Sequence, residues 1–136
     1  MNTSSSSDIG KLLLRVTLAA FILFHGASKV MHGIDGITGM VTNVGLPAIL
    51  ANLVYVGEVF APILLLIGLW TRAAAAIVAV NMVVALLLAH TSQFLTLSSN
   101  GGWALELQGF YLASAITVLL MGAGRFSLGG ASGKWN

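Results

Sequence analysis

The ionisable side chains that could do chemistry in this sequence lie inside or beside long apolar runs. An ionisable group is costly within a membrane span and normally faces a bundle interior or a water-filled cavity. Histidine titrates near neutral pH, and a carboxyl or ammonium group can exchange a proton with a polar ligand. The candidates are Arg15, His25, Lys29, Glu58, His90 and Glu106, with the polar residues Tyr55, Asn81 and Gln108 nearby.

Helical spacing groups several of these residues into shared faces. His25 and Lys29 are four residues apart and share a face of one helix, while Tyr55 and Glu58 are three apart on another. Pro62 follows Glu58 by four residues, so its ring removes the hydrogen bond to the Glu58 carbonyl. The spacing therefore predicts a buried acid beside an irregular, kinked part of its helix.

Depth along the apolar runs separates the candidates further. Glu58 lies near the midplane of its run, and Arg15 lies in the inner third, about 9 Å from the inner end at 1.5 Å per residue. The remaining ionisable residues fall in the outer third and predict an outer polar cluster of His25, Lys29, His90 and Glu106.

The partner of Glu58 is left open by spacing. Arg15 could pair with Glu58 and keep it ionised, or extend to the inner headgroups and leave it protonated. Lys29 is expected to extend to the outer headgroups. Asn81 and His90 fall on opposite faces of one helix, so both can point inward only if that helix ends before His90.

Composition excludes several classes of protein. The 136 residues suggest one domain; 57% are hydrophobic and 7% charged, against roughly 25% charged in a soluble domain. This composition excludes a water-soluble globule and a disordered chain. The net charge is only +2, from basic residues spread along the chain, so no nucleic-acid partner is expected. The chain has no cysteine and hence no disulfide or thiolate metal site.

The apolar runs predict an all-α membrane protein that forms a bundle of four transmembrane helices. Each run is close to the roughly 20 residues that cross a bilayer, and none alternates as a barrel strand would. A mobile head is expected at 1–8, irregular chain at the glycine-rich segment 32–46, and a mobile tail at 129–136. The transmembrane domain is then 9–128, with spans at about 9–31, 47–70, 72–91 and 103–122.

Basic residues predict the orientation of the bundle. With a retained first helix, one side carries five Lys and Arg residues and the other side carries only Lys29. The positive side faces the cytoplasm, so both termini are expected there, in a bacterial cytoplasmic (inner) membrane. The five residues are Lys11, Arg15, Arg72, Arg125 and Lys134.

The order of short motifs resembles the DoxX family of small four-helix membrane proteins. The resemblance covers roughly residues 9–128, and it implies a membrane oxidoreductase subunit linked to thiosulfate:quinone oxidoreduction, thiol homeostasis or quinone and catechol stress. Without cysteines, a thiol step would occur on a partner or substrate. The matching residues are 12–15, 24–29, 45–47, 57–58, 66–72, His90, 100–103, Glu106 and 122–128.

The first functional hypothesis is a membrane oxidoreductase component that binds quinone, or a similar small redox substrate, in the polar cluster. Electrons would come from a bound cofactor, a redox partner in solution or in the membrane, or the quinol itself. The expected catalytic residues are His25, Glu58, His90 and Glu106, and no metal ligands are expected. The expected substrate-binding residues are Arg15, Lys29, Tyr55, Asn100 and Trp103.

Other hypotheses remain beside it. His25 and His90 could ligate a haem through two imidazoles, although hydrogen-bonded histidines are the commoner case. A midplane Glu58 beside Pro62 could serve a small proton-coupled transporter, which would need a homo-oligomer. The polar residues could also be internal contacts of a non-catalytic membrane anchor or assembly subunit. In every case the lipid bilayer is the first partner.

Overall fold

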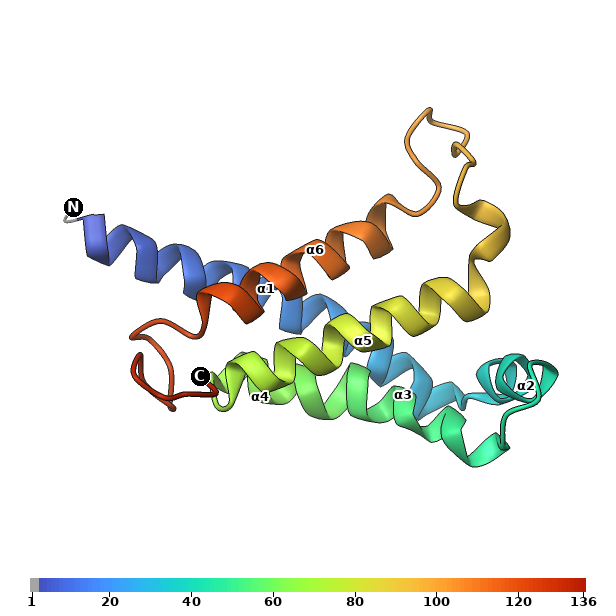
Figure 1. Cartoon of the computed structure of the whole chain (residues 1–136), viewed down its shortest axis with the longest axis horizontal. Helices are drawn as coiled ribbons and strands as arrows, with labels where there is room; N and C mark the ends of the chain where they lie inside the picture. Colours follow the sequence, from blue (N-terminus) through green and yellow to red (C-terminus); the bar gives the residue numbers. More distant parts are fainter. Residues whose placement is uncertain (1–2) are drawn as a thin grey trace.

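The computed structural model describes residues 3–136, and this part of the chain is helical (Figure 1). An isolated bridge pairs Leu97 with Trp103, and the described residues form no β-strand. In chain order the helical elements are α1 (Thr3–His32), α2 (Asp35–Asn43), the 3-10 turn η1 (Ala48–Asn52), α3 (Leu53–Tyr55), the π-helical η2 (Val56–Phe60), α4 (Ala61–Ile67), α5 (Thr71–Ala89), the 3-10 turn η3 (Thr91–Gln93) and α6 (Glu106–Met121).

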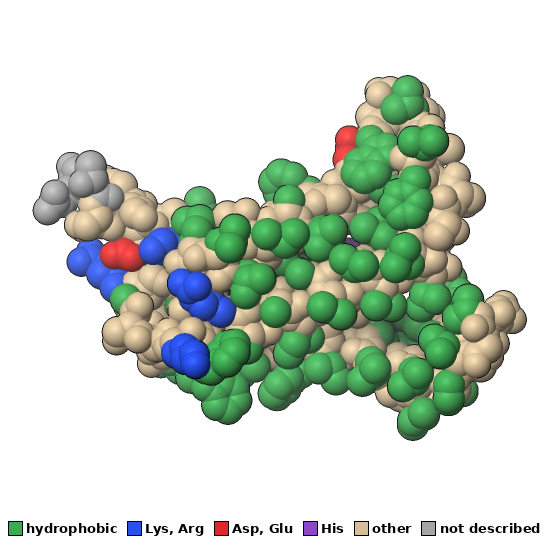
Figure 2. Space-filling model, viewed as in Figure 1, with side chains coloured by type: hydrophobic (Ala, Val, Ile, Leu, Met, Phe, Trp, Pro, Cys, Tyr) green, Lys and Arg blue, Asp and Glu red, His purple; other side chains and the backbone are tan. Residues whose placement is uncertain are grey.

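Three helical stretches are long and apolar enough to cross a membrane: Ser4–His32, Ala48–Ile67 and Thr71–Ala89. A shorter apolar helix, α6, has 16 residues. Figure 2 shows hydrophobic side chains over the middle of the visible surface, with Lys and Arg side chains gathered at one end. The chain is therefore an integral membrane protein whose outer surface contacts lipid, because a surface this apolar is not stable in water.

Small side chains hold the main helices together. Ala19, Ala61, Ala74, Ala75 and Ala115 are fully buried where α1, α4, α5 and α6 pack. Small residues let helix backbones approach closely, which is how helices associate in a membrane. Figure 1 shows these helices running along the same long axis, with the C-terminus and the start of α1 at one end and α2 with the 90–105 segment at the other. We call these the terminal end and the loop end.

The helical stretch that carries Glu58 changes its hydrogen bonding at η2. Pro62 lacks an amide N–H, so the Glu58 carbonyl has no donor four residues ahead. The Ala61 amide instead donates to the Val56 carbonyl, five residues back. Such π segments are rare in proteins as a whole, and those that occur are often found at functional sites. The irregularity predicted from Pro62 is thus present, as a π segment.

The prediction of irregular chain over 32–46 is wrong, because α2 occupies Asp35–Asn43. The hydroxyls of Thr38 and Thr42 donate to carbonyls in the preceding turn, and α2 packs on η1 while burying Val41. Glycines lower helix propensity by about 1 kcal/mol each, and tertiary packing readily offsets that amount.

The two ends of the chain have structure that the expected head and tail did not include. Helix α1 begins at Thr3, six residues before the expected start of the span at residue 9. The C-terminal segment folds back on the turn between α4 and α5, where Thr71 Oγ1 donates to Asn136 Oδ1 over 2.9 Å. Arg125 Nε lies 3.4 Å from Asp8 Oδ2 and links this segment to α1. The division into head, transmembrane domain and tail stays a prediction.

Candidate functional site

Glu58 is the centre of a buried polar group that joins three elements. Lys29 on α1 forms a salt bridge with Glu58 Oε2, and Asn81 on α5 donates through Nδ2 to Glu58 Oε1 over 3.4 Å. The side chain of Glu58 is 8% exposed and that of Lys29 is 24% exposed. Both carboxylate oxygens therefore have a donor, which offsets the desolvation of the charge.

Two glycines allow these elements to come together. A Cβ on Gly26 would lie 2.1 Å from the Glu58 carbonyl oxygen, and a Cβ on Gly57 would lie 2.4 Å from Asn81 Cγ. Any larger residue at either position would separate η2 from its neighbour. The Glu58 carbonyl, which lacks a donor at Pro62, packs against Gly26, and the π segment presents the Glu58 side chain between α1 and α5.

A large cavity of about 700 Å³ adjoins this polar group. It lies between Lys29 on α1, helix α2, the stretch from η1 to η2, and α5. Its polar lining side chains are Lys29, Glu58 and Asn81, while the remaining lining is apolar and comes from residues such as Met40, Leu50 and Val84. Ligand cavities have this form, with apolar walls and a few placed polar groups.

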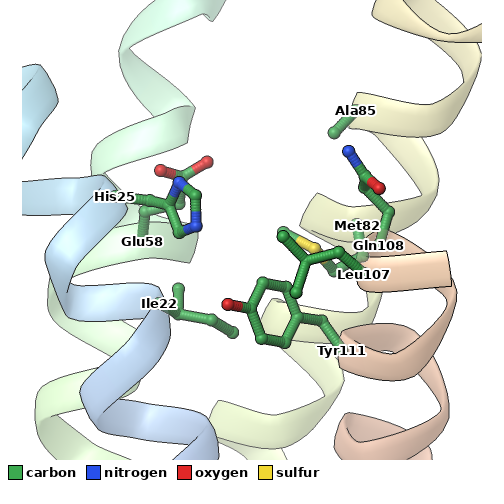
Figure 3. Close-up of a pocket in the computed structure, with 8 residues that line it drawn as sticks. All are labelled: Ile22, His25, Glu58, Met82, Ala85, Leu107, Gln108 and Tyr111. Atoms are coloured by element: carbon green, nitrogen blue, oxygen red, sulfur yellow. The ribbon is translucent and has the colours of Figure 1, made fainter. Parts of the chain in front are cut away.

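A small cavity of about 130 Å³ also adjoins Glu58 (Figure 3). It is lined from α1, η2, α5 and α6, and its polar lining side chains are His25, Glu58, Gln108 and Tyr111. In Figure 3 the His25 ring and the Glu58 carboxylate lie along one side of the cavity, across from Gln108. The rings of His25 and Tyr111 meet edge to face with centroids 6.0 Å apart.

His90 reaches this region from the end of α5. The helix ends at Ala89, so His90 lies just outside it, and Asn81 and His90 both point inward despite their opposite helical positions. Gln108 Nε2 lies 3.4 Å from His90 Nε2, and His90 Nδ1 lies 3.1 Å from Gln93 Oε1. His90 therefore links Gln108, which lines the small cavity, to the loop end.

The possible pairing of Arg15 with Glu58 is wrong, and so is the alternative that Lys29 extends away to the headgroups. Lys29 on α1 instead pairs with Glu58 on η2. Arg15 is 1% exposed, and its Nη2 donates to the Phe126 carbonyl over 2.7 Å at the terminal end. Its Nη1 fills the space beside Gly68, where a Cβ would lie 1.8 Å away. Because the C-terminal segment buries Arg15, its side chain does not extend outward as the headgroup alternative requires.

The remaining expected site residues lie at different distances from Glu58. Tyr55 is close, and its hydroxyl donates to the Lys29 carbonyl over 3.4 Å. Asn100 lies in a turn of the 90–105 segment, where Oδ1 accepts from the Gly102 amide over 3.2 Å. Trp103 Nε1 donates to the Phe94 carbonyl over 2.9 Å, and the exposed Glu106 lies against Gly102.

The expected outer cluster is therefore divided. Lys29 and His25 lie beside the cavities, and His90 connects to the small cavity through Gln108. Glu106 lines neither cavity. The sequence did not assign Asn81 and Gln108 as site residues, although their polarity inside apolar runs was a signal that could have found them. Among residues 3–136, no three His, Asp or Glu side chains are grouped so that they could hold a metal ion.

Comparisons with known proteins bear on the same part of the chain. The family model described as DoxX matches residues 10–91, which include Lys29, Glu58 and Asn81. A protein named "Putative oxidoreductase CatD", from Bacillus subtilis (strain 168), is 31% identical over 84 residues. That match covers 62% of this chain and 62% of the relative, so the chain spans less than two thirds of the length of the relative. No solved structure matches the chain significantly.

Proposed function

Because this chain belongs to the DoxX family, we propose that it is a membrane oxidoreductase component that binds a quinone, or a similar small redox-active ring, in the large cavity. The observation that carries the proposal is the cavity of about 700 Å³ that is apolar except at Lys29, Glu58 and Asn81. The name of the Bacillus subtilis relative supports a redox role. A lipid-soluble ring with two carbonyl oxygens matches apolar walls with a polar end.

The polar end has the donors that such a ring needs. Lys29 Nζ and Asn81 Nδ2 now donate to Glu58, and each could donate to a ring oxygen that enters between them. Reduction of a quinone takes up two electrons and two protons, and Lys29 and Glu58 are placed to exchange a proton with the bound oxygen. The chain has no cysteine, so we expect the electrons to come from a redox partner or a bound cofactor.

An Asn81→Leu substitution should weaken quinone binding about tenfold, because a lost hydrogen bond is worth about 1–1.5 kcal/mol. Binding of ubiquinone-1 and of menadione would be measured by calorimetry on the protein in lipid nanodiscs. The matched control is Asn52→Leu, since Asn52 is exposed and lines neither cavity. If neither quinone binds to the unmodified protein, the proposal is wrong.

A proton-coupled carrier is the second candidate function. The observation that favours it is that Glu58 lines both cavities and lies in a π segment within a helix that is apolar enough to cross the membrane. Transporters place their coupling groups at interrupted helices near the midplane. Proton-driven uptake of a quinone or a small acid into proteoliposomes, lost in Glu58→Gln, would favour this function over an oxidoreductase. This function would need a homo-oligomer to form a complete path.

We also propose that α6 is a fourth membrane span and that the terminal end faces the cytoplasm of a bacterial inner membrane. Support comes from the Lys and Arg side chains that gather at one end in Figure 2, because positive charge favours the cytoplasmic side. A Ser132→Cys variant, at an exposed position outside the candidate spans, should then react with an impermeant maleimide in inverted inner-membrane vesicles and stay unreacted in intact spheroplasts. The opposite pattern would reverse the proposed topology.

A further inference from the structure

We propose that the small cavity is a water-filled proton passage that connects Glu58 to the aqueous phase at the loop end, with His90 at its outer end. The inference rests on the proposed function for its purpose, which is to carry the protons that the ring in the large cavity takes up or releases. Its physical basis is independent of any quinone, because it depends only on the cavity and its polar lining.

The size and lining of the small cavity suit water. A volume of about 130 Å³ holds about four water molecules at roughly 30 Å³ each. A buried water needs two to four polar partners, and this cavity offers His25, Glu58, Gln108 and Tyr111. An apolar cavity of this volume would stay dry, so the four polar side chains are the feature that decides its content.

Glu58 is the polar side chain that lines both cavities, and Ala85 on α5 also lines both. The Glu58 carboxylate faces Lys29 at the large cavity and His25 at the small one, and both of these groups come from α1. The other packed elements contribute Tyr111 from α6 and the uncharged Asn81 from α5. A proton released in the large cavity can therefore pass to the Glu58 carboxylate and leave it through water in the small cavity.

The outer end of the passage is formed by Gln108 and His90. Gln108 lines the cavity and its amide contacts His90 Nε2, while His90 Nδ1 contacts Gln93, an exposed residue. Imidazole can accept a proton at one nitrogen and release one from the other. The Gln108 amide carries a donor and an acceptor. By rotating through 180° it can therefore hydrogen-bond to His90 Nε2 whether or not that nitrogen carries a proton. Gln108 is thus a positioning residue in this passage.

The absence of cysteine makes the passage directly testable, because any introduced thiol is the only one in the chain. Met82 lines the small cavity but not the large one, and Val78, one turn earlier on α5, is fully buried and lines neither. The probe is Ag⁺, a water-soluble thiol-reactive cation small enough for the cavity. It is applied to the protein in sealed vesicles, and the remaining thiol is counted with a maleimide after detergent is added.

The thiol of Met82→Cys should react with Ag⁺ at least ten times faster than the thiol of Val78→Cys. The reaction should occur from the side of the membrane opposite to that from which Ser132→Cys, an exposed position in the C-terminal segment at the terminal end, is modified. Adding Gln108→Leu should slow the reaction at least tenfold, because an apolar side chain would replace the amide at the outer end. Ile22→Cys is the second reporter, since Ile22 lines the same cavity from α1.

If Met82→Cys reacts no faster than Val78→Cys, and Ile22→Cys is also unreactive, the proposed passage is wrong. Reaction only from the side that modifies Ser132→Cys would also overturn it, because the passage would then open at the terminal end. This result is separable from the quinone proposal. Fast Ag⁺ reaction without quinone binding would support the passage and contradict the quinone proposal. Quinone binding without Ag⁺ reaction would support the quinone proposal and contradict the passage.

Discussion

A Lys29→Met substitution should lower the free energy of unfolding by about 3–5 kcal/mol, because it leaves Glu58 as a buried charge without its cation. Glu58 is nearly buried, and its remaining donor is the uncharged amide of Asn81. A neutral hydrogen bond compensates a desolvated carboxylate far less than an ammonium group does. The loss would be measured by denaturant unfolding in mild detergent, followed by circular dichroism of the helices.

The double variant Lys29→Met with Glu58→Gln is the decisive control. It removes both charges, and stability should return to within about 1 kcal/mol of the unmodified protein. Asp8→Asn supplies the comparison with a pair at the surface, in which Arg125 is 54% exposed and Asp8 is 19% exposed. An exposed pair contributes about 0–1 kcal/mol. If Lys29→Met loses no more than Asp8→Asn does, Glu58 is not a buried charge that depends on Lys29.

A Gly26→Ala substitution should lower the free energy of unfolding by about 3 kcal/mol, the upper part of the usual range for overpacking. The new Cβ would lie 2.1 Å from the Glu58 carbonyl oxygen and 2.8 Å from its carbonyl carbon. These are backbone atoms, so no side-chain rotation relieves the overlap, and α1 and η2 must separate. The same separation moves Lys29 from Glu58, so quinone binding should weaken together with stability.

Gly10→Ala is the matched control, in the same helix and with no atom within 4 Å of the new Cβ. Alanine is favoured over glycine in a helix by about 0.5–1 kcal/mol, so this variant should be slightly more stable than the unmodified protein. Both variants would be followed through thermal melting by circular dichroism. Melting temperatures for Gly26→Ala at or above that of Gly10→Ala would mean that α1 does not touch η2 at this glycine.

Pro62 connects the local sequence to the geometry of the site. Its missing N–H is a property of one residue, yet the carbonyl that loses its usual donor belongs to Glu58 and packs against Gly26 of another helix. The π segment and the two glycines, Gly26 and Gly57, form one arrangement that holds the acid between two cavities. Substitutions in this arrangement should therefore change both cavities together.

Much about this protein is determined by the sequence alone. A chain with 57% hydrophobic and 7% charged residues can be stable only with lipid around it, and backbone amides in lipid require helices. The same rule made the polar residues inside the apolar runs informative, since few residue types are tolerated there. Glu58, Lys29 and His25 were found in this way, and the motif order indicated the DoxX family that the family model confirms.

The partners of those residues were decided only by the tertiary structure. Depth left open whether Arg15 pairs with Glu58 or extends to the headgroups, and it did not predict that Lys29 pairs with Glu58. The C-terminal segment decides the first question, because Arg15 donates to the carbonyl of Phe126, 111 residues away in sequence. Helix α2 forms against local propensity, and it packs on η1 and α5 with Val41 buried. The two cavities depend on which faces of several helices meet. Helical periodicity fixes the faces of each helix but not how the helices turn toward one another, and that choice comes from side-chain packing.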